Sequence, residues 1–266
     1  MGRIIAFVGL IAIAATGAAW YFTQRSLPAT HVEDTKPHAD DEWLDELYSS
    51  NPAESTAAAK RVEQLGARAL PIIHTTLQDP SATTEHVKAA LKACGILGPV
   101  AAPAILEVAE QLPDPDLTAE AAIALSFMGR GALAPLREAL RSENTVVRRE
   151  ALRSIGKLRE RAPLEPAAVL PLLVARMQDT DAGVRTVAAT YLGILHEGAA
   201  EAVPALVEGL KDADPGVRRA AAAALGSFGE DAQSALPALR NAATDADEDV
   251  AREAGVSLVK LQPSQK

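Results

Sequence analysis

The chain has 266 residues, of which 48% are hydrophobic and 23% are charged, as in an ordinary folded protein. Aromatic residues make up only 3%, which argues against a β-sandwich, because strands are enriched in aromatic and β-branched residues. The formal net charge of −9 argues against general nucleic-acid binding, and the single cysteine, Cys94, excludes an internal disulfide framework and a cysteine-based zinc site.

The first predicted element is a membrane segment. Residues 4–22 contain no charged side chain, and the run is close to the about 20 apolar residues that a helix needs to cross a bilayer. We expect an uncleaved transmembrane signal-anchor within residues 1–25. The alternative is a secretory signal peptide cleaved after Ala19, because Gly17 and Ala19 provide the small residues that signal peptidase requires.

An acidic tether is expected to follow at residues 26–40. Residues 26–46 hold seven acidic residues and one basic residue, and two prolines interrupt any helix. His31 and His38 lie in this stretch and are interpreted as solvated tether and not as metal ligands. Because Lys and Arg favour the cytoplasmic side, we expect a single-pass protein of a bacterial inner (cytoplasmic) membrane. Its C-terminal body would face the periplasm or exterior, or would be secreted to the periplasm after signal cleavage.

A short amphipathic helix is predicted next, capped by Asp40 and Asp41. Its apolar side chains share one face by their spacing, and they are Trp43, Leu44, Leu47 and Tyr48. We interpret this helix as a cover for the end of a helical stack, since stacked repeats need such terminal caps.

An internal repeat occupies the rest of the chain, with a proline at intervals of 32, 32, 36, 33 and 33 residues. These prolines are Pro71, Pro103, Pro135, Pro171, Pro204 and Pro237. An apolar pair or turn follows each one, which predicts that the proline begins the second helix of a hairpin.

The first helix of each hairpin is predicted from a capping residue three positions before an apolar one. The pairs are Thr84/Val87, Asp114/Leu117, Asn144/Val147, Asp181/Val184, Asp214/Val217 and Asp247/Val250. Pro115 and Pro215 are expected at the first helical position. Gly193 and Gly226 are expected to end their helices near a C-cap.

Two departures from the repeat are visible. Residues 159–166 form an insertion in the fourth unit, expected to lengthen its inter-helix loop and to project from one rim. The last unit has one helix, 247–261, before the polar tail 263–266. We therefore predict about six hairpins with terminal caps within residues 41–262.

The pattern D-x-D-x-x-V-R occurs at residues 179–185 and 212–218 and resembles the HEAT repeat, especially the short PBS-lyase HEAT-like form. The resemblance covers about residues 50–262 and weakens towards the N-terminus, where Val-Arg becomes Val87-Lys88 and Leu117-Thr118. It implies an all-α, right-handed α-solenoid (a superhelix), and the apolar run at residues 4–22 adds one transmembrane helix before it. The usual work of such a solenoid is to act as a scaffold for protein–protein interaction.

Three arginines of this pattern, Arg148, Arg185 and Arg218, permit two interpretations. They could form an anion-binding ladder, or each could pair with a carboxylate of its own or the next unit. The resemblance favours the structural role, in which such ladders hold the register between repeats. Arg149 and Arg219, next along each helix, are expected to be surface charges.

Enzymatic relatives of the family include deoxyhypusine hydroxylase, which uses repeated His-Glu pairs, and the phycobilin lyases. This chain has one His-Glu pair, His196-Glu197, and one reversed pair, Glu85-His86, among only five histidines. Cys94 lies among apolar residues and is expected to be a small buried hydrophobe. We therefore expect no enzyme, no catalytic residue, no metal and no cofactor, with a lyase-like or hydroxylase-like oxidoreductase as the alternative.

The expected partner is another protein of unknown identity, with the membrane contacted through residues 4–22 and no nucleic acid or small-molecule substrate inferred. The resemblance implies that the second helices line the concave side. Candidate residues there are His74, Gln78, Glu107, Glu110, Glu138, Gln178, Glu208, Lys211 and Arg240. They share no charge sign, so the protein-binding residues stay open. Tyr191 is a candidate hot spot or a core residue.

Overall fold

A computed structural model describes residues 42–162 and 164–261. The chain divides into two units, residues 1–38 and 39–266, and the described residues all belong to the second. They form α-helices and short 3-10 segments, and no strand occurs among them. The predicted membrane segment, tether and polar tail, together with the capping residues Asp40 and Asp41, lie outside the described residues.

The helices alternate between two roles within each hairpin, here called A and B. The A helices are α2 (Pro52–Leu65), α4 (Thr84–Leu97), α6 (Thr118–Phe127), α8 (Thr145–Arg161), α10 (Ala182–Leu195), α12 (Pro215–Ser227) and α14 (Glu248–Leu261). The B helices are α3 (Leu70–Gln78), α5 (Ile105–Glu110), α7 (Leu133–Ala139), α9 (Pro166–Arg176), α11 (Ala199–Gly209) and α13 (Leu236–Ala242). The expected six hairpins are confirmed among the described residues, and α14 follows as a single helix.

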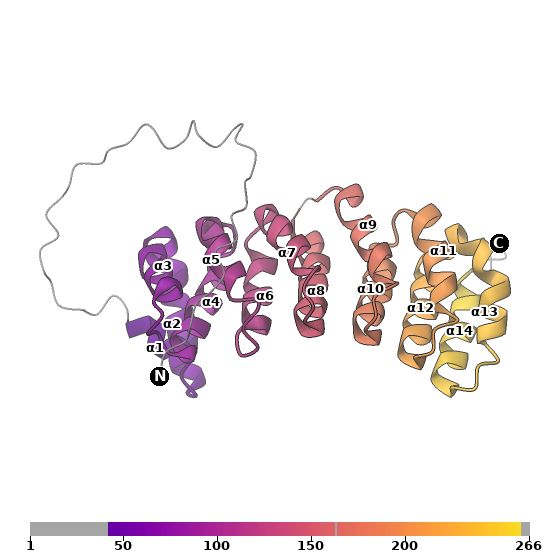
Figure 1. Cartoon of the computed structure of the whole chain (residues 1–266), viewed down its shortest axis with the longest axis horizontal. Coiled ribbons are helices and arrows are strands. Elements are labelled where there is room, and N and C mark those ends of the chain that lie inside the picture. The colour runs from indigo at the N-terminus through magenta and orange to yellow at the C-terminus, as the bar shows by residue number, and fades with distance from the viewer. Residues whose placement is uncertain (1–41, 163, 262–266) are drawn as a thin grey trace, which may run out of the picture. The chain divides into compact units, whose positions relative to one another are not determined.

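Neighbouring hairpins pack on one another in chain order, as Figure 1 shows. From α4 onwards each A helix contacts the next A helix, and each B helix contacts the A helix that follows it in the chain. The interior is built mainly of alanine and leucine, so the apolar face of one hairpin is covered by the next. This dependence between neighbours is the basis of stability in a repeat protein.

The first helix, α1 (Glu42–Leu47), packs on α2 and α4 as the predicted cover. Trp43, Leu44 and Leu47 are buried, which confirms three of the four expected apolar contacts. Tyr48 differs, because it lies just beyond the helix and its side chain remains 40% exposed. Its hydroxyl donates a hydrogen bond to Glu120 on α6, at 3.2 Å.

Side-chain caps begin the later A helices as predicted. The carboxylates of Asp181, Asp214 and Asp247 accept hydrogen bonds from the backbone N–H three residues on, at 3.0, 3.1 and 3.1 Å. Asn144 caps α8 through the N–H of Val146, and Pro215 begins α12. Such caps satisfy N–H groups that the first helical turn leaves without a backbone partner.

The caps of the two earlier helices differ from the prediction. Thr83, not Thr84, caps α4 by accepting from the N–H of His86 at 3.2 Å. Asp114 and Pro115 form a turn before α6, which begins only at Thr118 and has no side-chain cap. The hydroxyl of Thr118 donates to the carbonyl oxygens of Leu112 and Asp114, at 2.9 and 2.7 Å, and this closes the turn.

The recurring proline marks a fixed place in each hairpin but does not always begin the B helix. Pro71 and Pro237 lie at the start of α3 and α13, whereas Pro171 and Pro204 lie inside α9 and α11. A proline inside a helix deprives the carbonyl four residues earlier of its donor. In α9 and α11 that carbonyl belongs to an exposed alanine of the first turn, where solvent can replace the missing bond.

Half of the insertion at residues 159–166 is helical, and only residues 162–165 separate the two helices, which corrects the expectation of a longer inter-helix loop. Helix α8 continues to Arg161 and α9 already begins at Pro166. The added turn contacts both neighbouring repeats: Arg159 pairs with Glu197 at 3.2 Å, and the Arg161 guanidinium lies 4.1 Å from the ring centre of Phe127. The extension gains stability by packing between its neighbours.

Gly193 and Gly226 lie in the last turns of α10 and α12, near the C-caps His196 and Phe228, but they do not end these helices as predicted. They allow adjacent A helices to approach closely. A Cβ on Gly193 would lie 2.7 Å from the Cα of Ala224, and one on Gly226 would lie 3.2 Å from the Cα of Ser257. Both distances are shorter than normal contact between carbon atoms, and therefore glycine is required by packing here.

The corresponding position of α14, one repeat further on, holds Val259. Its side chain is 70% exposed on the last A helix among the described residues. Val256, one turn earlier, is 45% exposed. The last described A helix therefore carries a branched side chain, Val259, where the two preceding A helices carry the close-packing glycine.

One stretch among the described residues, Thr84–Glu110, is long and apolar enough to cross a membrane by length and composition alone. It joins α4, the 3-10 segment Gly98–Ala104 and α5, and half of its most apolar window is buried in the unit. Burial between neighbouring repeats accounts for this composition.

Candidate protein-binding surfaces

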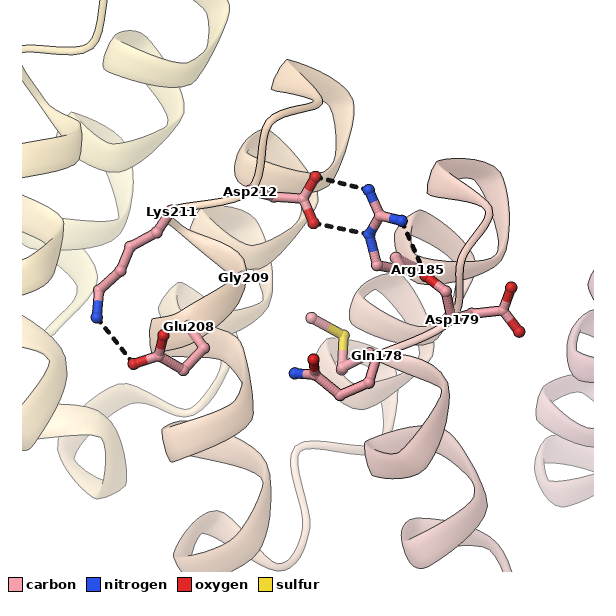
Figure 2. A pocket seen from close by; sticks show the side chains of 8 residues that line it. Gln178, Asp179, Arg185, Glu208, Gly209, Lys211 and Asp212 are labelled. Atoms are coloured by element: carbon pink, nitrogen blue, oxygen red, sulfur yellow. Dashed lines mark hydrogen bonds and ion pairs between the residues drawn. The ribbon is translucent and has the colours of Figure 1, made fainter.

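The Arg–Asp ladder joins successive repeats near the start of their A helices. Its three pairs are Arg148–Asp179, Arg185–Asp212 and Arg218–Asp245, with shortest N–O distances of 2.7, 2.7 and 2.8 Å. Each guanidinium uses two nitrogens on the two carboxylate oxygens. Figure 2 shows this two-pronged contact for Arg185 and Asp212. Such bidentate pairs are among the stronger and more directional ion pairs in proteins.

Each ladder residue also holds its own loop. The third nitrogen of Arg185 donates to the carbonyl oxygens of Asp179 and Thr180, at 2.8 and 3.2 Å. The carboxylate of Asp212 accepts the backbone N–H of Asp214 at 2.9 Å. The ladder therefore fixes the loop of one repeat against the next, which supports the structural interpretation of these arginines.

The ladder stops towards the N-terminus because both partners change together. Thr118 occupies the place of Arg148 in the preceding repeat, and it bonds the loop of its own hairpin only. Ser142 occupies the place of Asp179. A threonine is too short to reach the next repeat, so no carboxylate is needed there. Arg149 and Arg219, predicted as surface charges, make long ion pairs of 3.4 and 3.7 Å near the surface.

The arginines lower the pKa of the ladder aspartates. Hydrogen bonds from Arg218 are the main cause for Asp245. Burial alone would raise the pKa of Asp212, but the hydrogen bonds from Arg185 and from the backbone N–H of Asp214 outweigh burial and leave that pKa below its usual value. The ionised carboxylate is therefore favoured by folding.

We expect this shift to make stability fall in acid. A carboxyl group whose folded pKa is depressed stabilises the fold fully above its unfolded pKa of about 3.9 and loses that contribution as the pH falls towards the folded pKa. The urea midpoint should decrease as the pH falls below about 4. Arg218→Met should flatten this decrease, and an unchanged pH dependence in that variant would contradict the assignment.

The structure brings some of the candidate B-helix residues together. His74 Nδ1 lies 3.0 Å from Glu107 Oε1, and Gln78 donates to the same oxygen at 3.3 Å, so these three residues link α3 to α5. Glu110 and Arg240 are exposed and lie outside these groupings. Glu138 pairs with Arg141 at 2.7 Å beside a hollow between α7 and α9.

The remaining candidates, Gln178, Glu208 and Lys211, line a hollow of about 370 Å³ between the ends of α9 and α11. Figure 2 shows that its charged groups are occupied: Lys211 reaches Glu208 at 2.8 Å, and Arg185 is held by Asp212. The charges of this hollow neutralise one another within the chain. It is therefore part of the repeat junction and offers no unpaired charge to a ligand.

A larger and more apolar hollow, here called the α4–α6 hollow, lies on the A helices. It has a volume of about 490 Å³. Among its lining side chains, Ile123 is 48% exposed and Phe127 is 38% exposed, and Tyr48 borders them. This surface was not predicted from the sequence, because the candidate binding residues were polar side chains of the B helices. The available signal was the lack of a polar face on α6, in the sequence TAEAAIALSF.

The other residues considered for chemistry have structural roles. His196 ends α10 with a left-handed backbone, φ 36°, and Glu197 pairs with Arg159. His86 Nε2 lies 2.7 Å from Asp45 and ties α4 to the α1 cover. The described residues contain no group of three or more His, Cys, Asp or Glu side chains that could hold a metal ion.

Two further candidates belong to the core. Cys94 is buried, and burial raises the pKa of its thiol to about 12, so the reactive thiolate is disfavoured. The ring of Tyr191 occupies the space above Gly156, where a Cβ would lie 2.1 Å from a ring carbon. Tyr191 is thus a core residue and not an exposed hot spot.

Residues 102–193 and 170–259 match the family described as HEAT repeats, and the two matches together span more than half of the chain. The chain belongs to the HEAT repeat family. The resemblance read from the D-x-D-x-x-V-R pattern is thereby confirmed at the level of the family. No curated protein matches the sequence.

Several solved structures resemble this chain at low sequence identity. A structure of Kap95p bound to RanGDP has a TM-score of 0.57 and 15% identity over 84% of this chain and 35% of that one, so this chain spans about a third of it. The CpcE–CpcF complex of phycocyanin lyase from Nostoc sp. PCC7120 has a TM-score of 0.49 and 23% identity, over 58% of this chain and 98% of that one. Human deoxyhypusine hydroxylase has a TM-score of 0.40 and 20% identity, over 85% of each chain. These likenesses concern the fold alone.

Proposed function

We propose that this HEAT-repeat chain is a non-catalytic scaffold that binds another protein outside the cytoplasm and is tethered to a membrane through residues 4–22. The observation that carries the proposal is the α4–α6 hollow, where Ile123, Phe127 and Tyr48 remain exposed. Clustered apolar side chains at a surface mark sites of interaction. Kap95p, which shares the fold, is seen bound to another protein, and this supports the same use here.

The other side-chain chemistry of the described repeats is consistent with this role. Arginine and aspartate, the charged residues that recur in the pattern, bond to each other between repeats. A row of repeats fixed in this way can present a surface whose parts keep their relative positions, which lowers the ordering cost of binding.

The proposal is tested by crosslinking the full chain in its native membrane and identifying the protein captured. Ile123→Glu should reduce that crosslinked species at least tenfold, because it places a charge in the apolar hollow, while the exposed position should leave folding intact. The matched control is Leu106→Glu, another exposed apolar residue (71%) on α5. Equal capture by wild type and Ile123→Glu would contradict the proposed surface.

Three measurements address the remaining parts of the proposal. Elemental analysis and an absorption spectrum of the purified chain should show neither iron nor tetrapyrrole, and about two irons per chain would instead support a hydroxylase-like enzyme. N-terminal sequencing should find the uncleaved start. A mature chain that begins at Trp20 would replace the anchor with a cleaved signal peptide.

A further inference from the structure

A second hollow lies in the row of B helices, between α7 and α9, and has a volume of about 390 Å³. This is the junction at which the proline spacing rises to 36 residues. Leu140 and Leu172 contribute apolar lining, and three arginines surround them. These arginines are Arg137, Arg141 and Arg176.

The positive charge of this hollow is only partly neutralised within the described residues. Its one acidic lining residue, Glu138, is bonded to Arg141. Arg137 is exposed and makes no ion pair there. The Nε of Arg176 is buried without a hydrogen-bond partner.

The carboxylate nearest to Arg176 does not supply the missing partner. Asp179 lies 3.9 Å from the Arg176 guanidinium, and both of its oxygens are already bonded to Arg148 at 2.7 and 3.0 Å. The hollow between α9 and α11 differs, because its charges are internally paired. An unpaired arginine is costly in a protein. The Nε of Arg176 is itself closed to solvent, but the Arg176 side chain is 27% exposed, and a ligand carboxylate in the hollow can approach this exposed part.

We propose that the α7–α9 hollow binds a carboxylate-rich segment of a protein partner, in which acidic side chains flank a small aliphatic one. Arginine presents a planar fork that matches a carboxylate, and arginine is enriched among residues that dominate binding energy. Leu140 and Leu172 provide contact for the aliphatic side chain. This inference names the partner's chemistry and rests on the proposed function only in that the partner is a protein.

A polyanionic nucleic acid suits this surface less well. Such binding depends on many phosphate contacts, whereas the arginines without a bonded carboxylate here are two, in a chain of net charge −9.

The test uses the purified full chain and a fluorescein-labelled peptide, Glu-Glu-Leu-Glu-Glu, in fluorescence anisotropy. Wild type should bind it at least tenfold more tightly than the corresponding lysine peptide. Arg137→Glu and Arg176→Met should each weaken binding at least tenfold. Arg219→Glu is the matched control, because Arg219 is an exposed arginine on α12. This variant should bind the acidic peptide as tightly as wild type does.

Several results would overturn the inference. The first is equal binding of the acidic and the lysine peptides. The second is a loss of peptide affinity in Arg219→Glu as large as the loss in Arg137→Glu. The third is complete displacement of the acidic peptide by a 10-fold excess of inorganic phosphate, which would indicate a simple anion site. In a further variant, the acidic residues within 26–40 are replaced by the corresponding amides. If this variant binds the acidic peptide more tightly than wild type, the peptide competes with the chain's own tether, and the hollow would be assigned to the tether and not to a partner. Arg137→Glu should keep the wild-type thermal midpoint, since Arg137 has no partner to lose. In the crosslinking experiment, the partner is captured by wild type. If Ile123→Glu loses this capture and Arg137→Glu keeps it, the proposed function stands and this inference is refuted.

Discussion

Replacing Arg148 with methionine is expected to lower the free energy of unfolding by about 3–5 kcal/mol, the usual result of removing one partner of a buried ion pair. Arg148–Asp179 is the most buried pair of the ladder, with side chains 10% and 4% exposed. The methionine would fill part of the space but would leave the Asp179 carboxylate without its two arginine bonds. Urea unfolding followed by far-UV circular dichroism measures the loss.

The matched control for this prediction is Arg219→Met. Arg219 lies 3.7 Å from Asp249, and both side chains are more than half exposed, so the loss should stay below about 1 kcal/mol. Adding Asp179→Asn to Arg148→Met should recover part of the stability, because no buried charge then remains uncompensated. Equal losses for Arg148→Met and Arg219→Met would refute the structural role of the ladder.

Gly193→Ala should destabilise the chain by about 3 kcal/mol, at the upper end of ordinary overpacking. The new methyl group would lie 2.7 Å from the Cα and 2.9 Å from the Cβ of Ala224. One of these atoms is backbone, so relief requires α10 and α12 to separate. The change should lower both the urea midpoint and the thermal midpoint.

Gly255→Ala is the control, and it should change the stability in the opposite direction. Gly255 also lies within a helix, but no atom stands within 4 Å of the position its Cβ would take. Alanine there should raise stability by about 0.5–1 kcal/mol through its better helix propensity. A neutral effect of Gly193→Ala would show that close approach of the A helices contributes little.

Sequence reasoning succeeded where the signal is local. The caps Asp181, Asp214 and Asp247 bond the N–H three residues on, so the capping residue and its partner lie in one turn and can be read together. The hairpin period was also readable, because it repeats along the chain. The same reasoning failed at Asp114-Pro115, where the hydroxyl of Thr118 closes a turn before the helix begins.

The features that were missed depend on contacts between repeats. Gly193 resembles a helix-ending glycine in sequence, and only the position of Ala224 in the next hairpin shows that it is a packing glycine. Arg185 could have paired in its own repeat or the next, and the geometry selects Asp212. Arg137 on α7 and Arg176 on α9 line the same hollow but lie 39 residues apart in sequence, at a junction whose spacing departs from the repeat, so no single motif contains them.

The valine that replaces glycine at the edge of α14 has a consequence for assembly. An identical chain approaching this edge with one of its own helices would meet the branched side chain of Val259 at the point where Gly193 and Gly226 permit near contact. The close distance between neighbouring A helices inside the stack could not be reproduced at this edge. Copies of the chain joined end to end would need a looser fit. A looser fit disfavours the addition of further copies and therefore disfavours open-ended filaments.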